Sequence, residues 1–168
     1  MRLPIIISAA LLLSLGLNLS AISETPAEKT QYQTQTNNNL NLRRLRFNKR
    51  LWEQANISNY RITVSNSCFC IQDARGPVVI EVRNGQTTSI TSVATGKPVN
   101  PQFFQQYNTI PKLFNVIQDA INRKAFNLDV EYNAKLGYPT KINIDYNSQI
   151  ADEEIFLTIE KFQEIKPR

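Results

Sequence analysis

Hydrophobic and polar positions follow a helical period in two segments of this chain. In the first, residues 43–57, apolar residues recur every three to four positions, which is the spacing of an amphipathic helix. We expect its apolar residues to share one broad face: Leu45, Phe47, Leu51, Trp52 and Ala55. The second helix is expected to begin after Thr109, a suitable cap, with Pro111 tolerated in its first turn. Its apolar stripe consists of Ile110, Leu113, Phe114, Ile117, Ala120 and Ile121.

Period-two alternation predicts six strands between and after these helices. The expected ranges are 60–71, 77–83, 86–93, 127–133, 140–146 and 154–162. Asn84-Gly85 is a strong hairpin signal, because both residues tolerate positive φ. Helix followed by three strands therefore occurs twice, at about 40–93 and 109–162. The order predicts an α+β fold, with two amphipathic helices packed on an antiparallel sheet of about six strands, and suggests a degenerate α-β-β-β duplication.

The first 23 residues have the pattern of an export signal. Arg2 precedes an apolar run over residues 3–19, and Ala21-Ile22-Ser23 offers small residues for cleavage after Ser23. A retained transmembrane anchor is the alternative, because 3–22 is long enough to cross a bilayer. No cysteine stands at the exit, so a lipid anchor is not supported. We expect a signal peptide at 1–23 and an exported protein, periplasmic or extracellular.

The remaining chain divides into a linker and one domain. Residues 24–39 are polar and aperiodic, which predicts a disordered linker. Residues 40–166 are expected to form a single α+β domain, since this length allows one core.

The composition argues against most catalytic chemistry. The chain has no histidine, which excludes Ser-His-Asp and Cys-His nucleophiles and histidine metal sites. A net charge of +5 is mild and does not indicate nucleic acid. One acidic turn offers oxygen ligands from Asp145, Asn147, Asp152, Glu153 and Glu154. It lacks the EF-hand pattern, so a solvated loop is favoured over a calcium site. We expect no cofactor, and an enzyme is not favoured.

The only two cysteines, Cys68 and Cys70, are two residues apart. In an extended strand their Cα atoms would be about 6.5 Å apart, near the upper limit for a disulfide. Such a small ring restricts the unfolded chain little, by about 1.6 kcal/mol. A structural bridge that ends the first strand in a kink, before a loop over 72–76, is the preferred hypothesis. Thiol exchange and two-coordinate Cu(I) binding stay open as alternatives.

The polar side of the first helix is strongly basic. It carries Arg43, Arg44, Arg46, Lys49 and Arg50. Such a helix can lie on anionic lipid, or it can be a solvated helix whose apolar stripe covers a sheet. The second interpretation is preferred, because Trp52 lies within the stripe.

Several stretches together resemble a family of small exported or lipid-anchored bacterial proteins that is catalogued as a domain of unknown function, DUF6174. They are Trp52 with Tyr60, "SCFC", "GPVVIEVRNGQ", "LFNVIQDAI", "VEYNAKLGYPTKINID" and "DEEI". The resemblance covers about residues 52–162. It implies an envelope location and the domain boundaries, and it implies no activity.

These observations together predict an exported, non-catalytic domain that acts by binding or as a cell-envelope component. Its partner is unknown; another envelope protein and an anionic membrane surface are the two candidates, and nucleic acid is not expected. The alternative function is that of a thiol-redox or Cu(I)-binding protein that uses Cys68 and Cys70.

Overall fold

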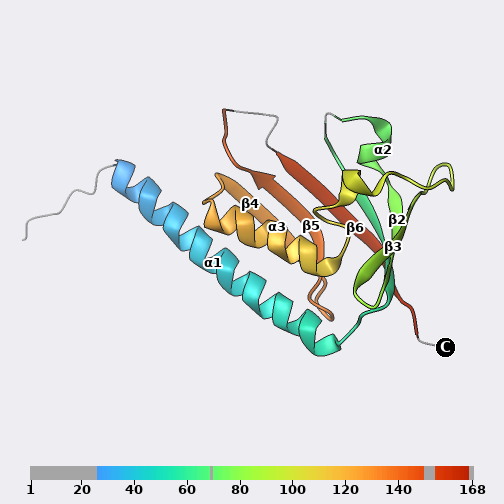
Figure 1. The fold of residues 1–168 in the computed structure, drawn as a ribbon. Helices are drawn as coiled ribbons and strands as arrows, with labels where there is room; N and C mark the ends of the chain where they lie inside the picture. Colours follow the sequence, from blue (N-terminus) through green and yellow to red (C-terminus); the bar gives the residue numbers. More distant parts are fainter. Residues whose placement is uncertain (1–25, 69, 150–153, 167–168) are drawn as a thin grey trace, which may run out of the picture.

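The computed structural model of this chain describes residues 26–68, 70–149 and 154–166 (Figure 1). Its elements are α1 (Pro26–Ala55), β1 (Tyr60–Asn66), α2 (Gln72–Arg75), β2 (Val78–Arg83), β3 (Gln86–Ser92), η1 (Pro101–Phe104), α3 (Ile110–Asn122), β4 (Asn127–Tyr132), β5 (Pro139–Asp145) and β6 (Ile155–Glu164). The predicted order, an amphipathic helix followed by three strands and then the same again, is confirmed. The predicted signal peptide and the acidic residues 152 and 153 lie outside the described residues.

The strands form one antiparallel sheet in the order β3-β2-β1-β6-β5-β4. Each half of the chain contributes a set of three strands, and the first and last strands of the domain join the two halves at the centre. The β2–β3 hairpin turns at Asn84-Gly85, where both residues have positive φ, as predicted. Helices α1 and α3 lie side by side over one face of the sheet (Figure 1). The α+β fold class is therefore confirmed.

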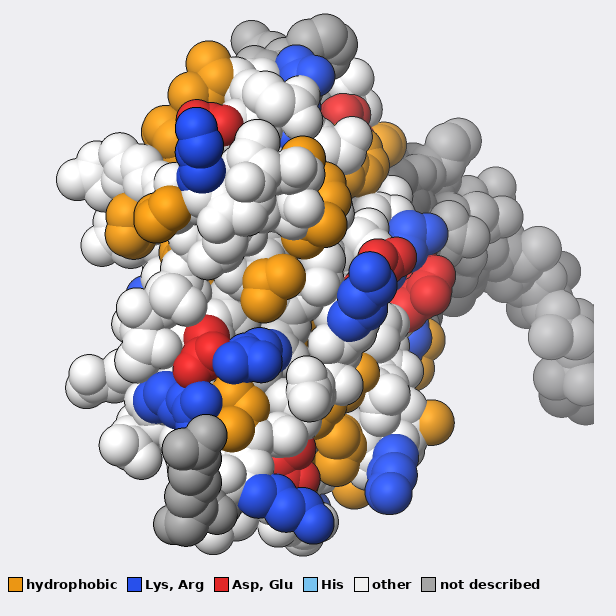
Figure 2. Space-filling view, turned by 90° about the vertical axis from the view of Figure 1, so that its right-hand side faces the viewer, with side chains coloured by type: hydrophobic (Ala, Val, Ile, Leu, Met, Phe, Trp, Pro, Cys, Tyr) orange, Lys and Arg blue, Asp and Glu red, His pale blue; other side chains and the backbone are white. Residues whose placement is uncertain are grey.

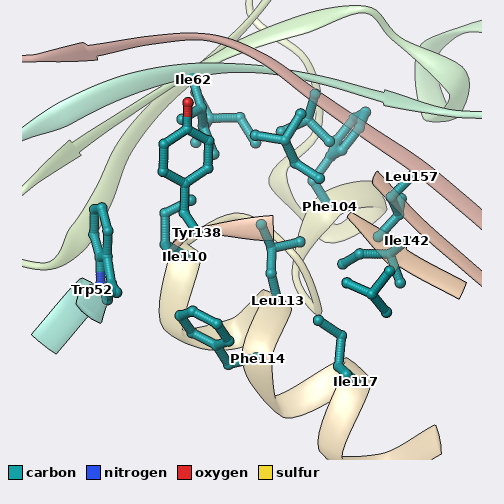
Figure 3. Packing of buried hydrophobic residues seen from close by; sticks show 14 of the residues in the cluster. Trp52, Ile62, Phe104, Ile110, Leu113, Phe114, Ile117, Tyr138, Ile142 and Leu157 are labelled. Atoms are coloured by element: carbon teal, nitrogen blue, oxygen red, sulfur yellow. The ribbon is translucent and has the colours of Figure 1, made fainter. Parts of the chain in front are cut away.

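The core fills the space between this face of the sheet and the two helices. Thr109 caps α3, since its side chain accepts a hydrogen bond from Lys112 N. The predicted stripe of α3 is fully buried, and Leu113 and Ile117 point from it toward Ile142 and Leu157 of the sheet (Figure 3). The predicted α3 face is thus the one that covers the sheet.

An aromatic cluster closes the end of the core where α1 finishes. Trp52 packs edge-on against Tyr60, with ring centroids 5.4 Å apart, and against Phe162 at 5.8 Å. The hydroxyl of Tyr60 accepts a hydrogen bond of 2.9 Å from Ile110 N. Burial raises the pKa of Tyr60 to about 12. This cluster joins α1, the central strands and the start of α3.

The opposite face of the sheet carries mostly polar side chains. Arg61 and Arg83 both form ion pairs of 2.7 Å with Glu81 there. On the side of the molecule seen in Figure 2, basic and acidic side chains stand next to one another rather than gathering by sign. One hydrophobic and one polar face is the usual pattern of an antiparallel sheet covered by helices on one side.

Helix α1 begins within residues 24–39, the segment for which the sequence predicts a disordered linker. The helix begins at Pro26 and runs without a break to Ala55, and its first turns extend beyond the sheet in Figure 1. Two physical reasons account for this. Once the turns packed on the core have formed, each further residue adds one hydrogen bond at little entropic cost. The segment also has several good helix formers, among them Ala27, Glu28, Lys29 and Gln31.

The predicted apolar face of α1 was also wrong at one position. Leu45 and Trp52 are buried, and Leu51 and Ala55 are partly buried, but 62% of the Phe47 side chain is exposed. Successive residues of a helix are rotated by about 100°, so Phe47 lies about 200° from Leu45, almost on the opposite side. Positions 47, 51 and 55 are rotated by about 40° per step, so this row runs from the exposed Phe47 toward the partly buried Leu51 and Ala55.

The end of β1 differs from prediction as well. The strand finishes at Asn66, before the cysteines, and residues 72–75 form the single helical turn α2 rather than a loop. Cys68 and Cys70 are therefore part of the connection between β1 and α2, not of the strand face that carries Tyr60.

Candidate functional site

The side of α1 that is turned away from the sheet combines cations with exposed apolar side chains. We call the surface formed by Leu40, Arg43, Arg46, Phe47 and Arg50 the outer face of α1. All five residues are exposed, Leu40 to 55% and Phe47 to 62%. Between residues 43 and 50, five of the eight residues are basic and none is acidic. The outer face is thus a positively charged strip with two exposed hydrophobic side chains.

Arg44 has a different role from its basic neighbours. Its Nη2 donates a 2.8 Å hydrogen bond to the carbonyl oxygen of Val130, and its guanidinium carbon lies 5.9 Å from the ring centroid of Tyr132. One turn earlier, Asn41 Nδ2 donates to the carbonyl oxygen of Leu128 at 3.3 Å. Both carbonyls belong to the edge strand β4. Arg44 therefore fixes α1 to the edge of the sheet and covers backbone groups that could otherwise pair with another strand.

Lys49 also lies apart from the outer face. It lines a hollow of about 220 Å³ between the end of α1 and the start of α3, together with Trp52, Pro111 and Phe114. Of the five basic residues singled out from the sequence, Arg43, Arg46 and Arg50 are brought together on the outer face. Arg44 and Lys49 are directed to the two flanks of the helix.

The two cysteines are bridged to each other. Cys68 and Cys70 form a disulfide with their Cα atoms 5.3 Å apart, and both residues are partly buried. Close by, Asn66 Nδ2 donates a 3.1 Å hydrogen bond to the hydroxyl of Tyr107. The bridge lies between the end of β1 and α2, so its direct effect is local. The bridge itself agrees with the preferred hypothesis, but β1 ends before it at Asn66, and residues 72–75 form α2 rather than a loop.

A second hollow, missed from the sequence, lies beside α3. It has a volume of about 630 Å³ and is lined by residues that are far apart in the chain: Gln105, Gln106, Lys112, Asn115, Val116, Asp119, Tyr146 and Ile155. The Tyr146 hydroxyl donates to Asp119 Oδ2 at 3.2 Å, and the Arg123 guanidinium lies 3.9 Å from the Tyr146 ring centroid. Burial, and after it the Asp119 carboxylate, raises the pKa of Tyr146. Because its lining comes from separate segments, no local motif could have indicated this hollow.

Within residues 26–68, 70–149 and 154–166, no group of three or more cysteine or acidic side chains is placed to hold a metal ion. In the same residues, no helix is long and apolar enough to cross a membrane. The outer face of α1 is the candidate binding surface, because it combines exposed cations with exposed apolar side chains; the hollow beside α3 is a separate depression.

These features define a class: an α+β domain with two helices on one face of a six-stranded antiparallel sheet and a basic, partly apolar outer helix face. The chain belongs to DUF6174, a family of unknown function, whose profile matches residues 44–164. No curated protein matches the chain, and no solved structure does. The matched range contains the whole sheet and two of the three arginines of the outer face, Arg46 and Arg50.

Proposed function

We propose that this chain is an exported, non-catalytic domain of the cell envelope that acts by binding through the outer face of α1. Three features support export. The N-terminal residues have the pattern of a cleavable signal ending at Ser23. The only two cysteines are joined, which suits an oxidising compartment. The resemblance of several stretches to exported bacterial proteins points the same way.

The observation that carries the binding proposal is the exposure of Phe47 among arginines. A large aromatic side chain contributes little to folding while it stays in water, whereas burying it in a partner gains roughly 1.5–3 kcal/mol. Phe47 stands one turn from both Arg43 and Arg50, so a partner that covers it also meets two cations. A face of this composition favours a partner with an anionic and an apolar component.

A non-catalytic role is supported by the titratable groups. The chain has no histidine, and both cysteines are oxidised. Burial raises the pKa values of Tyr60 and Tyr132 to about 12, so both phenols stay neutral at physiological pH. Groups held in a single protonation state bind and orient well but exchange protons poorly.

Export can be tested with the full chain expressed in a bacterium. We expect the protein in the periplasmic or secreted fraction, with an intact mass that starts at Glu24 and lacks the two thiol hydrogens. Protein that stays in the cytoplasm with residues 1–23 attached would contradict export.

Binding is tested by adding purified residues 24–168 to isolated cell envelopes and sedimenting them. We expect co-sedimentation that Arg43→Gln/Arg50→Gln weakens and that Arg75→Gln/Lys97→Gln, a pair of exposed cations away from α1, does not. Equal sedimentation of both variants would exclude the outer face.

The thiol-redox and Cu(I) alternative is tested on the same purified protein. Insulin reduction or stoichiometric Cu(I) binding that disappears in Cys70→Ser would overturn the binding proposal. We expect neither, since the bridge lies in a short connection and joins residues only two positions apart.

A further inference from the structure

We infer that the partner of the outer face of α1 is an anionic phospholipid surface. The inference rests on the proposed function and names its partner. It is carried by the arrangement of charge and apolar side chains on α1, by the sign of the charge, and by the segment of chain that precedes the helix.

The outer face has the layout of a helix that lies flat on a bilayer. Leu40 and Phe47 are seven residues apart, hence on the same side of the helix and about 10.5 Å from each other along its axis. Arg43 and Arg50 are also seven residues apart, and their side of the helix is rotated by about 60° from the side that carries Leu40 and Phe47. Two exposed hydrophobic side chains thus run parallel to two exposed arginines. On a lipid surface, the first pair would enter the acyl boundary while the second pair stays at the level of the phosphates.

The charge of this strip is complementary to an anionic bilayer. Glu53 is the one acidic residue between Arg43 and Ala55, and it lies beyond the strip, one turn after Arg50. None of the ion pairs found among the described residues involves Arg43, Arg46 or Arg50. Their guanidinium groups can therefore bind lipid phosphates, which arginine does in a bidentate manner. By contrast, the side of the molecule in Figure 2 mixes both signs of charge.

The position of α1 in the chain also favours lipid over a protein groove. The apolar run of residues 3–19 is separated from the start of α1 at Pro26 by only a few residues. Where this run is retained as an anchor, the alternative that the sequence leaves open, the helix after it is held next to the membrane. A flat, wide surface also suits the strip, since its five side chains project from one side of a regular helix.

Docking in this orientation would leave the rest of the domain accessible. The sheet lies on the other side of α1 (Figure 1), and its polar face is the one that the helices leave uncovered. Arg44 and Asn41 hold α1 against β4 by hydrogen bonds to Val130 and Leu128. The helix is therefore a rigid part of the domain, so binding needs no rearrangement.

The test is co-sedimentation of residues 24–168 with phosphatidylcholine vesicles that either contain or lack phosphatidylglycerol. We expect binding to the anionic vesicles only, and its release at high salt, where the Debye length falls to about 3 Å. Arg43→Gln/Arg50→Gln should weaken the partition by roughly 10- to 30-fold. Phe47→Ser should weaken it by roughly tenfold.

Two matched controls make the result specific. Ile71 is exposed to 62%, as Phe47 is, but lies beside α2, so Ile71→Ser should bind like the unchanged protein. Arg75→Gln/Lys97→Gln removes the same charge from other surfaces and should lower the partition by less than about threefold. All substituted side chains are exposed, and melting curves check that every variant folds.

Two outcomes would overturn the inference. One is sedimentation with neutral and anionic vesicles alike, and the other is equal loss of binding in the outer-face and control variants. Absence of vesicle binding together with retained, Arg43- and Arg50-dependent binding to isolated envelopes would also exclude lipid as the partner. In that case the proposed function would stand, with an envelope protein or wall polymer bound instead.

Discussion

The two sides of helix α1 carry similar hydrophobic residues in opposite environments. On the inner side, Leu45 and Trp52 are almost fully buried against the sheet, with Trp52 only 6% exposed. On the outer side, Leu40 and Phe47 are more than half exposed among arginines. The comparison shows that the angular position of an apolar residue, and not the number of such residues, decides which ones build the core. We assign the two exposed apolar residues of the outer side to a partner, because they stand among arginines.

Truncating the inner side should have the largest effect on stability. Trp52→Ala removes the ring that packs against Tyr60 and Phe162, and we expect it to lower the free energy of unfolding by about 3–5 kcal/mol. Phe47→Ala on the outer side should change it by less than about 0.5 kcal/mol. Urea titrations measure both. Similar losses for the two variants would mean that Phe47 belongs to the core.

Substitution at the contact between α1 and the turn over residues 133–138 should cause the second largest loss of stability. Gly137 has φ of 75°, and a Cβ there would overlap the Asn48 carbonyl oxygen of α1. We therefore expect Gly137→Ala to cost about 2–3 kcal/mol. Gly96 has a similar φ of 67° but no atom near its Cβ position, so Gly96→Ala should cost only about 1 kcal/mol. Thermal melts of the two variants separate the effect of the steric overlap from that of the backbone strain. Equal shifts of the melting temperature would contradict the close approach of Gly137 to α1.

Substitutions of the two neighbouring arginines at the start of the basic run should differ in their effect on the free energy of unfolding, by a smaller amount than the substitutions above. Arg44→Gln loses the hydrogen bond to Val130 and the contact with the Tyr132 ring, for which we expect a loss of about 1–2 kcal/mol. Arg43→Gln should be neutral within about 0.5 kcal/mol and should act on vesicle binding instead. The opposite pattern in urea titrations and in sedimentation would reverse the assignment of these residues.

Reduction of the Cys68–Cys70 bridge should have the smallest effect. The ring closes over one intervening residue, so its loss should lower stability by about 0–2 kcal/mol. Intact mass with and without reductant reports the bridge, and melting curves report its contribution. Full unfolding on reduction would show that this connection supports more than the β1–α2 junction.

Much of the fold could be predicted because its signals are local. The alternation in β1, β2 and β5, the Asn84-Gly85 turn and the Thr109 cap each depend on residues that are close in sequence. The start of α1 at Pro26 was not predicted, because a polar stretch can become helical by propagation from a packed segment next to it. The strand order, with β1 beside β6, depends on contacts between distant parts of the chain and has no local signal.

The candidate site was predictable in composition but not in shape. All five basic residues are exposed, yet their separation into outer face, β4 contact and α3 hollow depends on how α1 is rotated on the sheet. A helical wheel drawn from Leu45 and Trp52 alone would have placed Phe47 outside. The hollow around Tyr146 and Asp119 needed the tertiary structure, since α3 and residues near the ends of η1, β5 and β6 all contribute to it.

The most direct test of the central claim compares tryptophans on the two sides of α1. Trp52 is the only tryptophan of the chain and is buried, so its emission should not respond to vesicles. In Phe47→Trp, we expect an added emission component that shifts to shorter wavelength with phosphatidylglycerol vesicles and is quenched by spin-labelled lipid. High salt should reverse both changes. An emission from position 47 that stays at the wavelength of a water-exposed tryptophan in the presence of anionic vesicles would contradict the account.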